Sequence, residues 1–162
     1  MSPRHTSVRQ ALTKAAAEGA RAAAVAPAGD STERGNATAD DAAPIEAVLG
    51  RLDQLIPHEP PARLHGDLWS GNVLWSTDGR TWLIDPAAYG GHREVDLAMM
   101  RLFGGFGERA FQAYAEVFPL ADGWPERVAV YQAVPLLVHA VLFGGGYAER
   151  SAEALRLASR GV

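Results

Sequence analysis

The 162-residue sequence contains no cysteine, which excludes disulfide bonds, thiolate metal sites and cysteine nucleophiles. It has a single lysine, Lys14, against 14 arginines, so chemistry that needs a placed lysine has one candidate. An excess of positive charge is also lacking, because the formal net charge is −4, and this argues against nucleic-acid binding. The longest apolar run, residues 133–143, is too short for a bilayer span of roughly 20 residues. No apolar signal-peptide core follows the first residues, so we expect a cytoplasmic protein without a membrane partner.

The distribution of residue types divides the chain into three segments. Residues 1–21 predict a short Ala-rich helix, and residues 22–43 predict a flexible low-complexity linker because no helical or strand period survives there. Residues 44–162 form the expected domain. Its apolar spacing predicts helices over residues 45–56, 95–103, 108–118, 128–142 and 148–160, with a kink expected at Pro135. The domain is therefore expected to be α+β and mostly α.

One β-hairpin is expected among these helices. Residues 73–75 and 82–84 are short β-type runs, and Asp78-Gly79 between them is typical of a hairpin turn. A two-residue turn places Trp75 opposite Trp82, as a packing pair, and Asn72 opposite Asp85, with side chains about 5 Å apart at Cβ. An amide oxygen beside a carboxylate suits Mg²⁺. A longer turn would shift this register.

A third polar residue, Asp67, precedes Asn72 by five positions. Phosphoryl transfer to a hydroxyl needs one carboxylate that accepts the hydroxyl proton, together with an Asn and an Asp that hold Mg²⁺ against the phosphates. Asp67, Asn72 and Asp85 supply this set. Taken singly, Asp67 and Asn72 could be turn residues, and Asp85 could cap the loop before Pro86; the three together favour a phosphotransferase.

Longer strings around these residues resemble the fructosamine kinases (ketosamine 3-kinases), within the aminoglycoside-phosphotransferase-like branch of the protein-kinase fold. The resemblance covers about residues 45–147. It rests on Leu64-His65-Gly66-Asp67-Leu68-Trp69-Ser70-Gly71-Asn72, on Ile84-Asp85-Pro86-Ala87-Ala88-Tyr89-Gly90-Gly91-His92-Arg93-Glu94, and on the segment from Asp96 to Phe106.

This resemblance implies the C-terminal lobe of a kinase-like fold that uses ATP and Mg²⁺. It implies Asp67 as catalytic base and Asn72 and Asp85 as Mg²⁺ ligands. His65 and Asp96 would brace the catalytic loop. The implied substrate is a small-molecule or protein-bound ketosamine, phosphorylated on a sugar hydroxyl, which makes the adduct labile and serves protein deglycation.

Several nearby residues have two interpretations each. Trp69 could stack on a sugar or pack under the loop. Four residues that follow the hairpin could line a substrate pocket or form a solvated loop before a helix: Tyr89, His92, Arg93 and Glu94. His139, in an apolar helix, is expected to be a core histidine.

The sequence departs from the kinase pattern ahead of residue 44. No Gly-rich strand–turn–strand segment precedes the domain, and Lys14 lies in an Ala-rich helical stretch, so we expect the nucleotide-binding N-terminal lobe to be missing. Two alternatives therefore remain open: an inactive, truncated C-lobe that at most binds a ligand, and a phosphotransferase for aminoglycosides or other small hydroxyl compounds. An uncovered lobe face would favour association between molecules.

Overall fold

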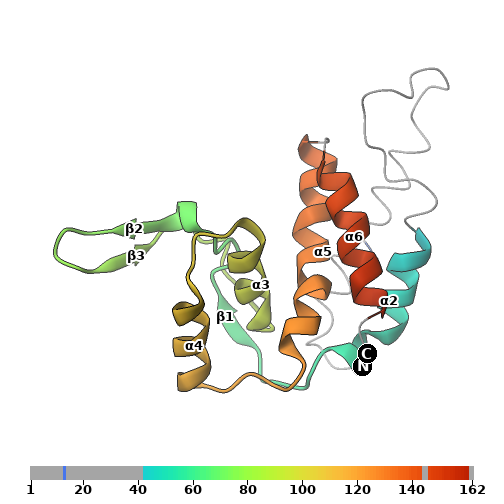
Figure 1. The fold of residues 1–162 in the computed structure, drawn as a ribbon, viewed down its shortest axis with the longest axis horizontal. Helices are drawn as coiled ribbons and strands as arrows, with labels where there is room; N and C mark the ends of the chain where they lie inside the picture. Colours follow the sequence, from blue (N-terminus) through green and yellow to red (C-terminus); the bar gives the residue numbers. More distant parts are fainter. Residues whose placement is uncertain (1–12, 14–41, 144–145, 161–162) are drawn as a thin grey trace.

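A computed structural model describes residue 13 and residues 42–143 and 146–160, and shows a mostly helical protein with two small antiparallel sheets. Of the helix predicted over residues 1–21, only Thr13 is among the described residues, and it is helical. The predicted linker also lies outside the described residues up to residue 41. The α+β, mostly α fold class is confirmed (Figure 1). The elements in chain order are α2 (Ala42–Leu55), β1 (Ala62–Leu64), the 3-10 turn η2 (Ser70–Asn72), β2 (Val73–Trp75), β3 (Thr81–Leu83), β4 (Tyr89–Gly91), α3 (Glu94–Phe103), α4 (Glu108–Val117), α5 (Trp124–Phe143) and α6 (Tyr147–Arg160).

The five predicted helices are present, and local signals explain their ends. After α2 the prolines at 57, 60 and 61 carry the chain onward in an extended form. α3 ends at Gly104, whose φ of 70° is disfavoured for residues with a side chain. Pro119 follows α4 by two residues. Pro135 lies inside α5 and lacks the N–H that would bond the carbonyl of Tyr131, yet the helix continues.

The main core lies where α2, α5 and α6 pack together, with α3 against the other side of α5 (Figure 1). α5 packs against α6 on one side and α3 on the other, which explains why apolar residues occur on several of its faces. No helix in the described ranges is both long enough and apolar enough to cross a membrane. The fully buried residues of this core include Val48, Leu52, Val130, Ala133 and Leu155.

A second, smaller core joins α3 to α4. Leu97 and Met100 of α3 pack on Phe111 of α4, with Trp124 stacked on Phe111 at 6.2 Å between ring centroids. Beside α3, β1 pairs antiparallel with β4, which places Leu64 opposite Tyr89. The sequence did not predict this sheet. It joins the segment before the His65–Asn72 loop to the segment that leads into α3.

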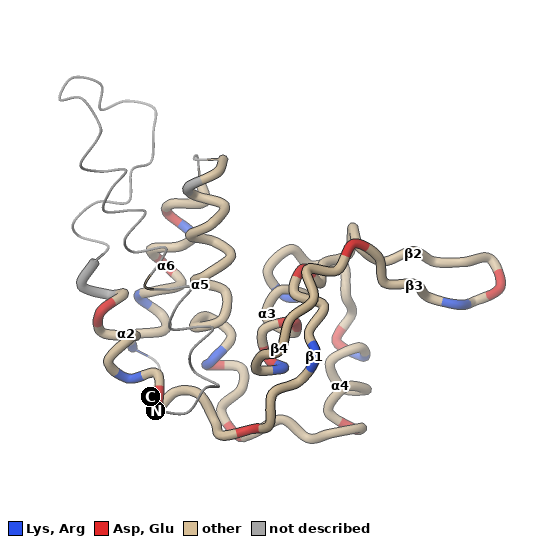
Figure 2. Tube along the Cα trace, turned by 180° about the vertical axis from the view of Figure 1, so that it is seen from behind, with Lys and Arg blue, Asp and Glu red and all other residues tan. Residues whose placement is uncertain are grey.

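The β2–β3 hairpin is present, but its predicted register is wrong by one residue. Leu74 lies opposite Trp82 and Trp75 opposite Thr81, so the expected Trp75–Trp82 pair does not form. The Ser76 N–H donates to the Arg80 carbonyl, which closes a three-residue loop in which Gly79 has a φ of 81°. The hairpin projects away from the helices (Figure 1), and charged residues lie at its tip but not in its strands (Figure 2).

Candidate functional site

The loop from His65 to Asn72 is held at its start by the carboxylate of Asp96, in the first turn of α3. The backbone N–H of His65 donates to Asp96 Oδ2 at 2.7 Å, and the N–H of Gly66 donates to Oδ1 at 2.9 Å. Hydrogen bonds to a charged acceptor are stronger than neutral ones, so Asp96 fixes the backbone just before Asp67. This geometry agrees with a bracing function for Asp96.

The imidazole of His65 joins the same loop to the end of the hairpin. Its Nδ1 accepts the N–H of Asp67 at 3.3 Å, which leaves the ring proton on Nε2, and Nε2 donates to the Ile84 carbonyl at 3.0 Å. Ile84 directly precedes Asp85. His65 therefore links the backbone of Asp67 to the backbone that carries Asp85, and both ring nitrogens are occupied.

The short turn η2 brings Asn72 back onto Asp67. The N–H of Asn72 donates to the Trp69 carbonyl at 3.0 Å, and its side-chain Nδ2 donates to the Asp67 carbonyl at 2.9 Å and to Asp67 Oδ2 at 3.1 Å. The side chain of Asn72 is buried. Because both amide hydrogens are directed at Asp67, the amide oxygen of Asn72 is the atom that remains for another ligand.

Asp85 does not lie opposite Asn72 as the sequence predicted. The N–H of Ile84 donates to the Asn72 carbonyl at 3.0 Å, so Ile84 faces Asn72 and Asp85 follows one residue later. The cause is the three-residue hairpin loop. Asp85 is exposed and has a φ of 51°, a left-handed conformation that Asp adopts more readily than most residues.

A cavity of about 490 Å³ opens beside this loop, between β4, α3 and α5. Asp67 contributes the only carboxylate among the described residues that line it. The other walls are apolar or aromatic, and this size is in the range of small-molecule sites. Its main lining residues are Gly66, Asp67, Tyr89, Met99, Tyr131, Val134, Val138 and His139.

Sequence reasoning found only part of this lining. Of the tentative pocket residues, Tyr89 lines the cavity and burial raises the pKa of its hydroxyl. Trp69 is not among the lining residues; its ring packs against Phe103 with centroids 6.0 Å apart. The α5 residues were missed, because an apolar position facing a cavity has the same sequence pattern as one facing the core. His139, expected in the core, lies at the cavity wall.

Arg93 and Glu94 neither line the cavity nor lie in a solvated loop, contrary to both expectations. Arg93 donates to both carboxylate oxygens of Glu59, at 2.6 and 2.9 Å, and to the carbonyls of Phe118 and Pro119. Glu94 is 0% exposed and accepts two hydrogen bonds from Arg127, at 2.6 and 2.9 Å. The hydrogen bond from Arg93 lowers the pKa of Glu59. These pairs connect the segment after α2 with α3 and α5.

His92 lies inside this pair network rather than at the cavity. Its ring stacks on Tyr131, with centroids 5.4 Å apart, and its Nδ1 accepts the Glu94 N–H at 3.4 Å. His92 Nε2 lies 3.9 Å from Glu59 Oε2, beyond hydrogen-bond distance, and it and the Tyr131 hydroxyl are buried without hydrogen-bond partners among the described residues. Burial lowers the pKa of His92 and raises that of Tyr131.

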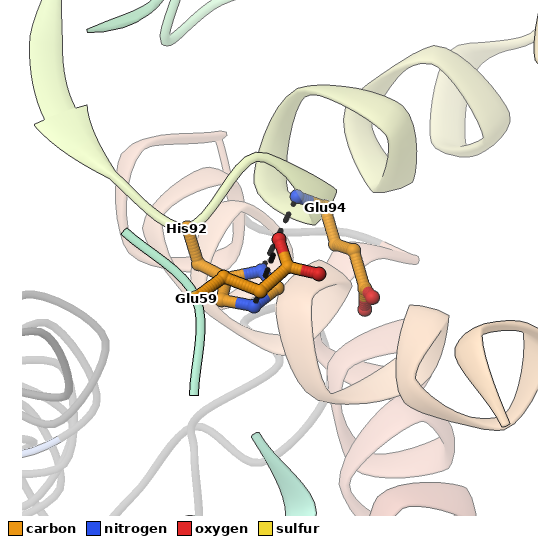
Figure 3. Close-up of side chains that lie close together, drawn as sticks. All are labelled: Glu59, His92 and Glu94. Carbon is orange, nitrogen blue, oxygen red and sulfur yellow. Dashed lines mark hydrogen bonds and ion pairs between the residues drawn. The ribbon is translucent and has the colours of Figure 1, made fainter. Parts of the chain in front are cut away.

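Glu59, His92 and Glu94 come close enough together to resemble a metal site. One potential ligand atom from each lies within 4.8 Å of the others (Figure 3). Each carboxylate, however, already carries a bidentate arginine, so the two negative charges are balanced and a cation would have to displace Arg93 or Arg127. The cluster is therefore a buried ion-pair network that holds the site's framework together.

Known proteins match this chain over most of the residues that the structure describes. A family model described as fructosamine kinase matches residues 31–159. A relative from Thermus thermophilus named as a probable ketoamine kinase is 48% identical over 103 residues, which is 64% of this chain and 38% of the relative. A relative of the same name from Enterococcus faecium is 48% identical over 87 residues, covering 54% of this chain and 31% of the relative.

Solved structures agree with the sequence matches. A crystal structure from Thermobifida fusca, described as a "putative fructosamine-3-kinase", has a TM-score of 0.80 and 44% identity, and the match covers 96% of this chain and 50% of that one. A second, from Haemophilus somnus, has a TM-score of 0.61 and 30% identity over 72% of this chain and 40% of that one. The chain thus spans half the length of the first structure and less than two-fifths of the curated relatives described above.

Proposed function

The chain belongs to the fructosamine kinase family, and from this membership we propose that it takes part in the ATP-dependent phosphorylation of a sugar hydroxyl on a ketosamine. The observation that carries the proposal is the contact between Asp67 and Asn72 at the edge of a small-molecule cavity. Removal of the sugar adduct from proteins would be the consequence of this reaction.

In this proposal Asp67 is the catalytic base. Asp67 lines the cavity, where the acceptor hydroxyl would bind, and its Oδ2 accepts a hydrogen bond from Asn72. A base must lie within hydrogen-bond reach of the proton it accepts, and a rigid loop preserves that reach. Asp96 and His65 supply the rigidity through bonds to the backbone on either side of Gly66.

Asn72 and Asp85 fit the binding of Mg²⁺ with ATP phosphates. The amide oxygen of Asn72 and the exposed carboxylate of Asp85 are hard oxygen donors of the kind that Mg²⁺ prefers. The orientation of Asn72 is fixed by the two hydrogen bonds that it donates to Asp67. A bound Mg²⁺ would neutralise charge on the phosphates, while the chain's own residues orient the hydroxyl and accept its proton.

The test compares the chain with its Asp67→Asn variant. With MgATP and a fructosyl amine, the wild-type chain is expected to release ADP and to give a sugar phosphate visible by ³¹P NMR. Asp67→Asn keeps the size of the side chain and its contact with Asn72 but cannot accept the proton. Its rate is expected to fall by roughly 10²–10⁴-fold, the usual contribution of a positioned base.

Asp122→Asn is the matched control. Asp122 is exposed, and its recorded hydrogen bond, from Arg127, uses the backbone carbonyl, so this variant should retain the wild-type rate. Near-normal turnover by Asp67→Asn would refute the assigned base. Product formation from an aminoglycoside but from no ketosamine would change the acceptor class, and no phosphorylated product from the wild-type chain would contradict the activity itself.

A further inference from the structure

The imidazole of His139, on α5, lines the same cavity as Asp67. Its Nδ1 lies 2.7 Å from the carbonyl oxygen of Pro135, one turn earlier in the helix. Because a carbonyl can only accept, Nδ1 carries the ring proton, and in the neutral ring Nε2 holds the lone pair. Nε2 has no hydrogen-bond partner among the described residues. His139 can therefore offer a ligand an acceptor that the fold itself does not use.

Three aromatic rings surround the imidazole of His139 and hold it in place. Its centroid lies 5.4 Å from that of Phe103 on α3, 5.5 Å from that of Phe143 on α5 and 5.1 Å from that of Tyr147 on α6. These contacts and the bond to the Pro135 carbonyl restrict the torsions of the side chain. A binding group that is already ordered loses little conformational entropy when its ligand arrives.

The polar groups that line the cavity suit a ligand with a positive charge. No arginine or lysine lines it in the part of the chain that the structure describes, whereas the Asp67 carboxylate and Nε2 of neutral His139 can only accept hydrogen bonds. The hydroxyls of Tyr89 and Tyr131 can donate or accept, and aromatic rings attract cations to their faces. A protonated amine makes charge-assisted hydrogen bonds with such acceptors, roughly twice as strong as those of an uncharged hydroxyl.

A ketosamine carries a secondary amine beside its sugar, and this nitrogen is protonated at neutral pH. Under the proposed function, Asp67 accepts the proton of the reacting hydroxyl, and an ammonium group paired with the same carboxylate would compete with that step. The ammonium group therefore needs a second acceptor in the cavity. Among the uncharged side chains that line the cavity in the described ranges, His139 alone has a basic nitrogen lone pair.

We propose that His139 binds the protonated amine nitrogen of the ketosamine through Nε2 and thereby selects ketosamines over uncharged sugars. This inference rests on the proposed function, which supplies the ketosamine and leaves Asp67 to the reacting hydroxyl. His139 is in this sense a specificity-determining residue, because it recognises the atom that links the sugar to its substituent and takes no part in the proton transfer.

The test compares two ligands that differ only at the linking atom, by isothermal titration with the 162-residue chain at neutral pH. One ligand is the fructose adduct of n-butylamine. The other is 1-O-butyl fructose, the uncharged ether in which oxygen replaces the amine nitrogen. The wild-type chain is expected to bind the amine roughly tenfold more tightly than the ether, because only the amine can donate a charged hydrogen bond to Nε2.

Two substitutions separate the acceptor of His139 from the packing of its ring. His139→Phe keeps an aromatic ring among the neighbouring rings but has no acceptor, so binding of the amine should weaken about tenfold while binding of the ether changes by less than about twofold. His139→Gln carries an amide whose oxygen can accept in place of Nε2, and should retain most of the preference for the amine. Circular dichroism reports whether each variant is folded.

His58→Phe is the matched control, because His58 is exposed and is not among the residues that line the cavity. It should preserve both affinities. Three results would overturn the inference and leave the proposed function intact: wild-type binding of the amine no tighter than that of the ether, an undiminished preference in folded His139→Phe, or equal losses in folded His139→Gln and His139→Phe. Absence of binding for both ligands in the wild-type chain would contradict the proposed function as well.

Discussion

At the scale of single residues, Gly66, next to the proposed base, has no room for a side chain. Its φ is 81°, and an added Cβ would lie 2.3 Å from the Ala87 carbonyl oxygen and 3.0 Å from the Tyr89 ring. Gly79, in the hairpin loop, also has a φ of 81° but has no atom within 4 Å of such a Cβ. A comparison of the two glycines therefore separates the cost of the left-handed backbone from the cost of a close contact with neighbouring atoms.

We predict that Gly66→Ala is far more harmful than Gly79→Ala. The left-handed backbone should cost Gly79→Ala about 1 kcal/mol of unfolding free energy. Gly66→Ala adds a clash with backbone, which cannot rotate away, so its cost should reach about 3 kcal/mol and its ketosamine binding should weaken. Urea denaturation of both variants measures the difference. Equal losses of stability would show that the close approach to Ala87 does not matter.

The residue scale also shows where sequence reasoning succeeds. Asp67 and Asn72 are five positions apart, so a local turn suffices to bring their side chains into contact, and a short motif can indicate such a pair. Arg93 is paired with Glu59, 34 residues earlier, and Glu94 with Arg127, 33 residues later. No local pattern indicates such distant partners, so the sequence alone does not distinguish buried ion-pair residues from pocket or solvated ones.

At the scale of elements, one residue in the hairpin loop decides the position of Asp85. The Asp78-Gly79 pair suits a two-residue turn, but Thr77 joins the loop and Gly79 takes the left-handed position of a three-residue turn. The alternation of side chains in β3 then shifts by one relative to β2. The sequence predicted the existence of the hairpin correctly and its register incorrectly, because both loop lengths suit the same residues.

The hairpin projects away from the helices and its large side chains are exposed, which predicts their small effect on stability. Trp75 is 76% exposed, so Trp75→Thr should change the unfolding free energy by less than about 0.5 kcal/mol. Phe111→Ala, in the α3–α4 core and 6% exposed, should cost about 3 kcal/mol or more. Denaturant titration compares the two. A cost above 1 kcal/mol for Trp75→Thr would mean that the hairpin packs against something in solution, such as a second molecule.

At the scale of the whole molecule, the buried pairs connect elements that are distant in the sequence. Arg93 bonds Glu59 and two carbonyls after α4, and Arg127 of α5 bonds Glu94 at the start of α3. Asp96, two residues after Glu94, holds the His65–Asn72 loop. A change in the pair network should therefore reach the proposed base through the first turn of α3.

This network makes the stability of the whole protein dependent on pH through His92. Its ring faces Glu59 and Glu94, which favour its protonation, and Arg93 and Arg127, which oppose it; burial is the largest effect and lowers its pKa. The unfolded chain, with an ordinary histidine pKa of about 6.5, therefore binds this proton more readily than the folded protein. Stability contributed by neutral His92 is complete above pH 6.5 and is lost as the pH falls from there toward the lowered pKa. Glu59, whose pKa is lowered by Arg93, stays ionised in this range.

We therefore predict that the unfolding free energy decreases between pH 7 and pH 5, with His92 contributing a slope of up to about 1.4 kcal/mol per pH unit. His92→Phe keeps a ring against Tyr131 but cannot titrate, so its curve should be flatter in this range. Tyr131→Phe removes the hydroxyl and leaves His92 in place, and should retain the wild-type slope. Urea unfolding at half-unit pH steps measures all three proteins. An unchanged slope in His92→Phe would mean that His92 is not the group whose protonation destabilises the fold.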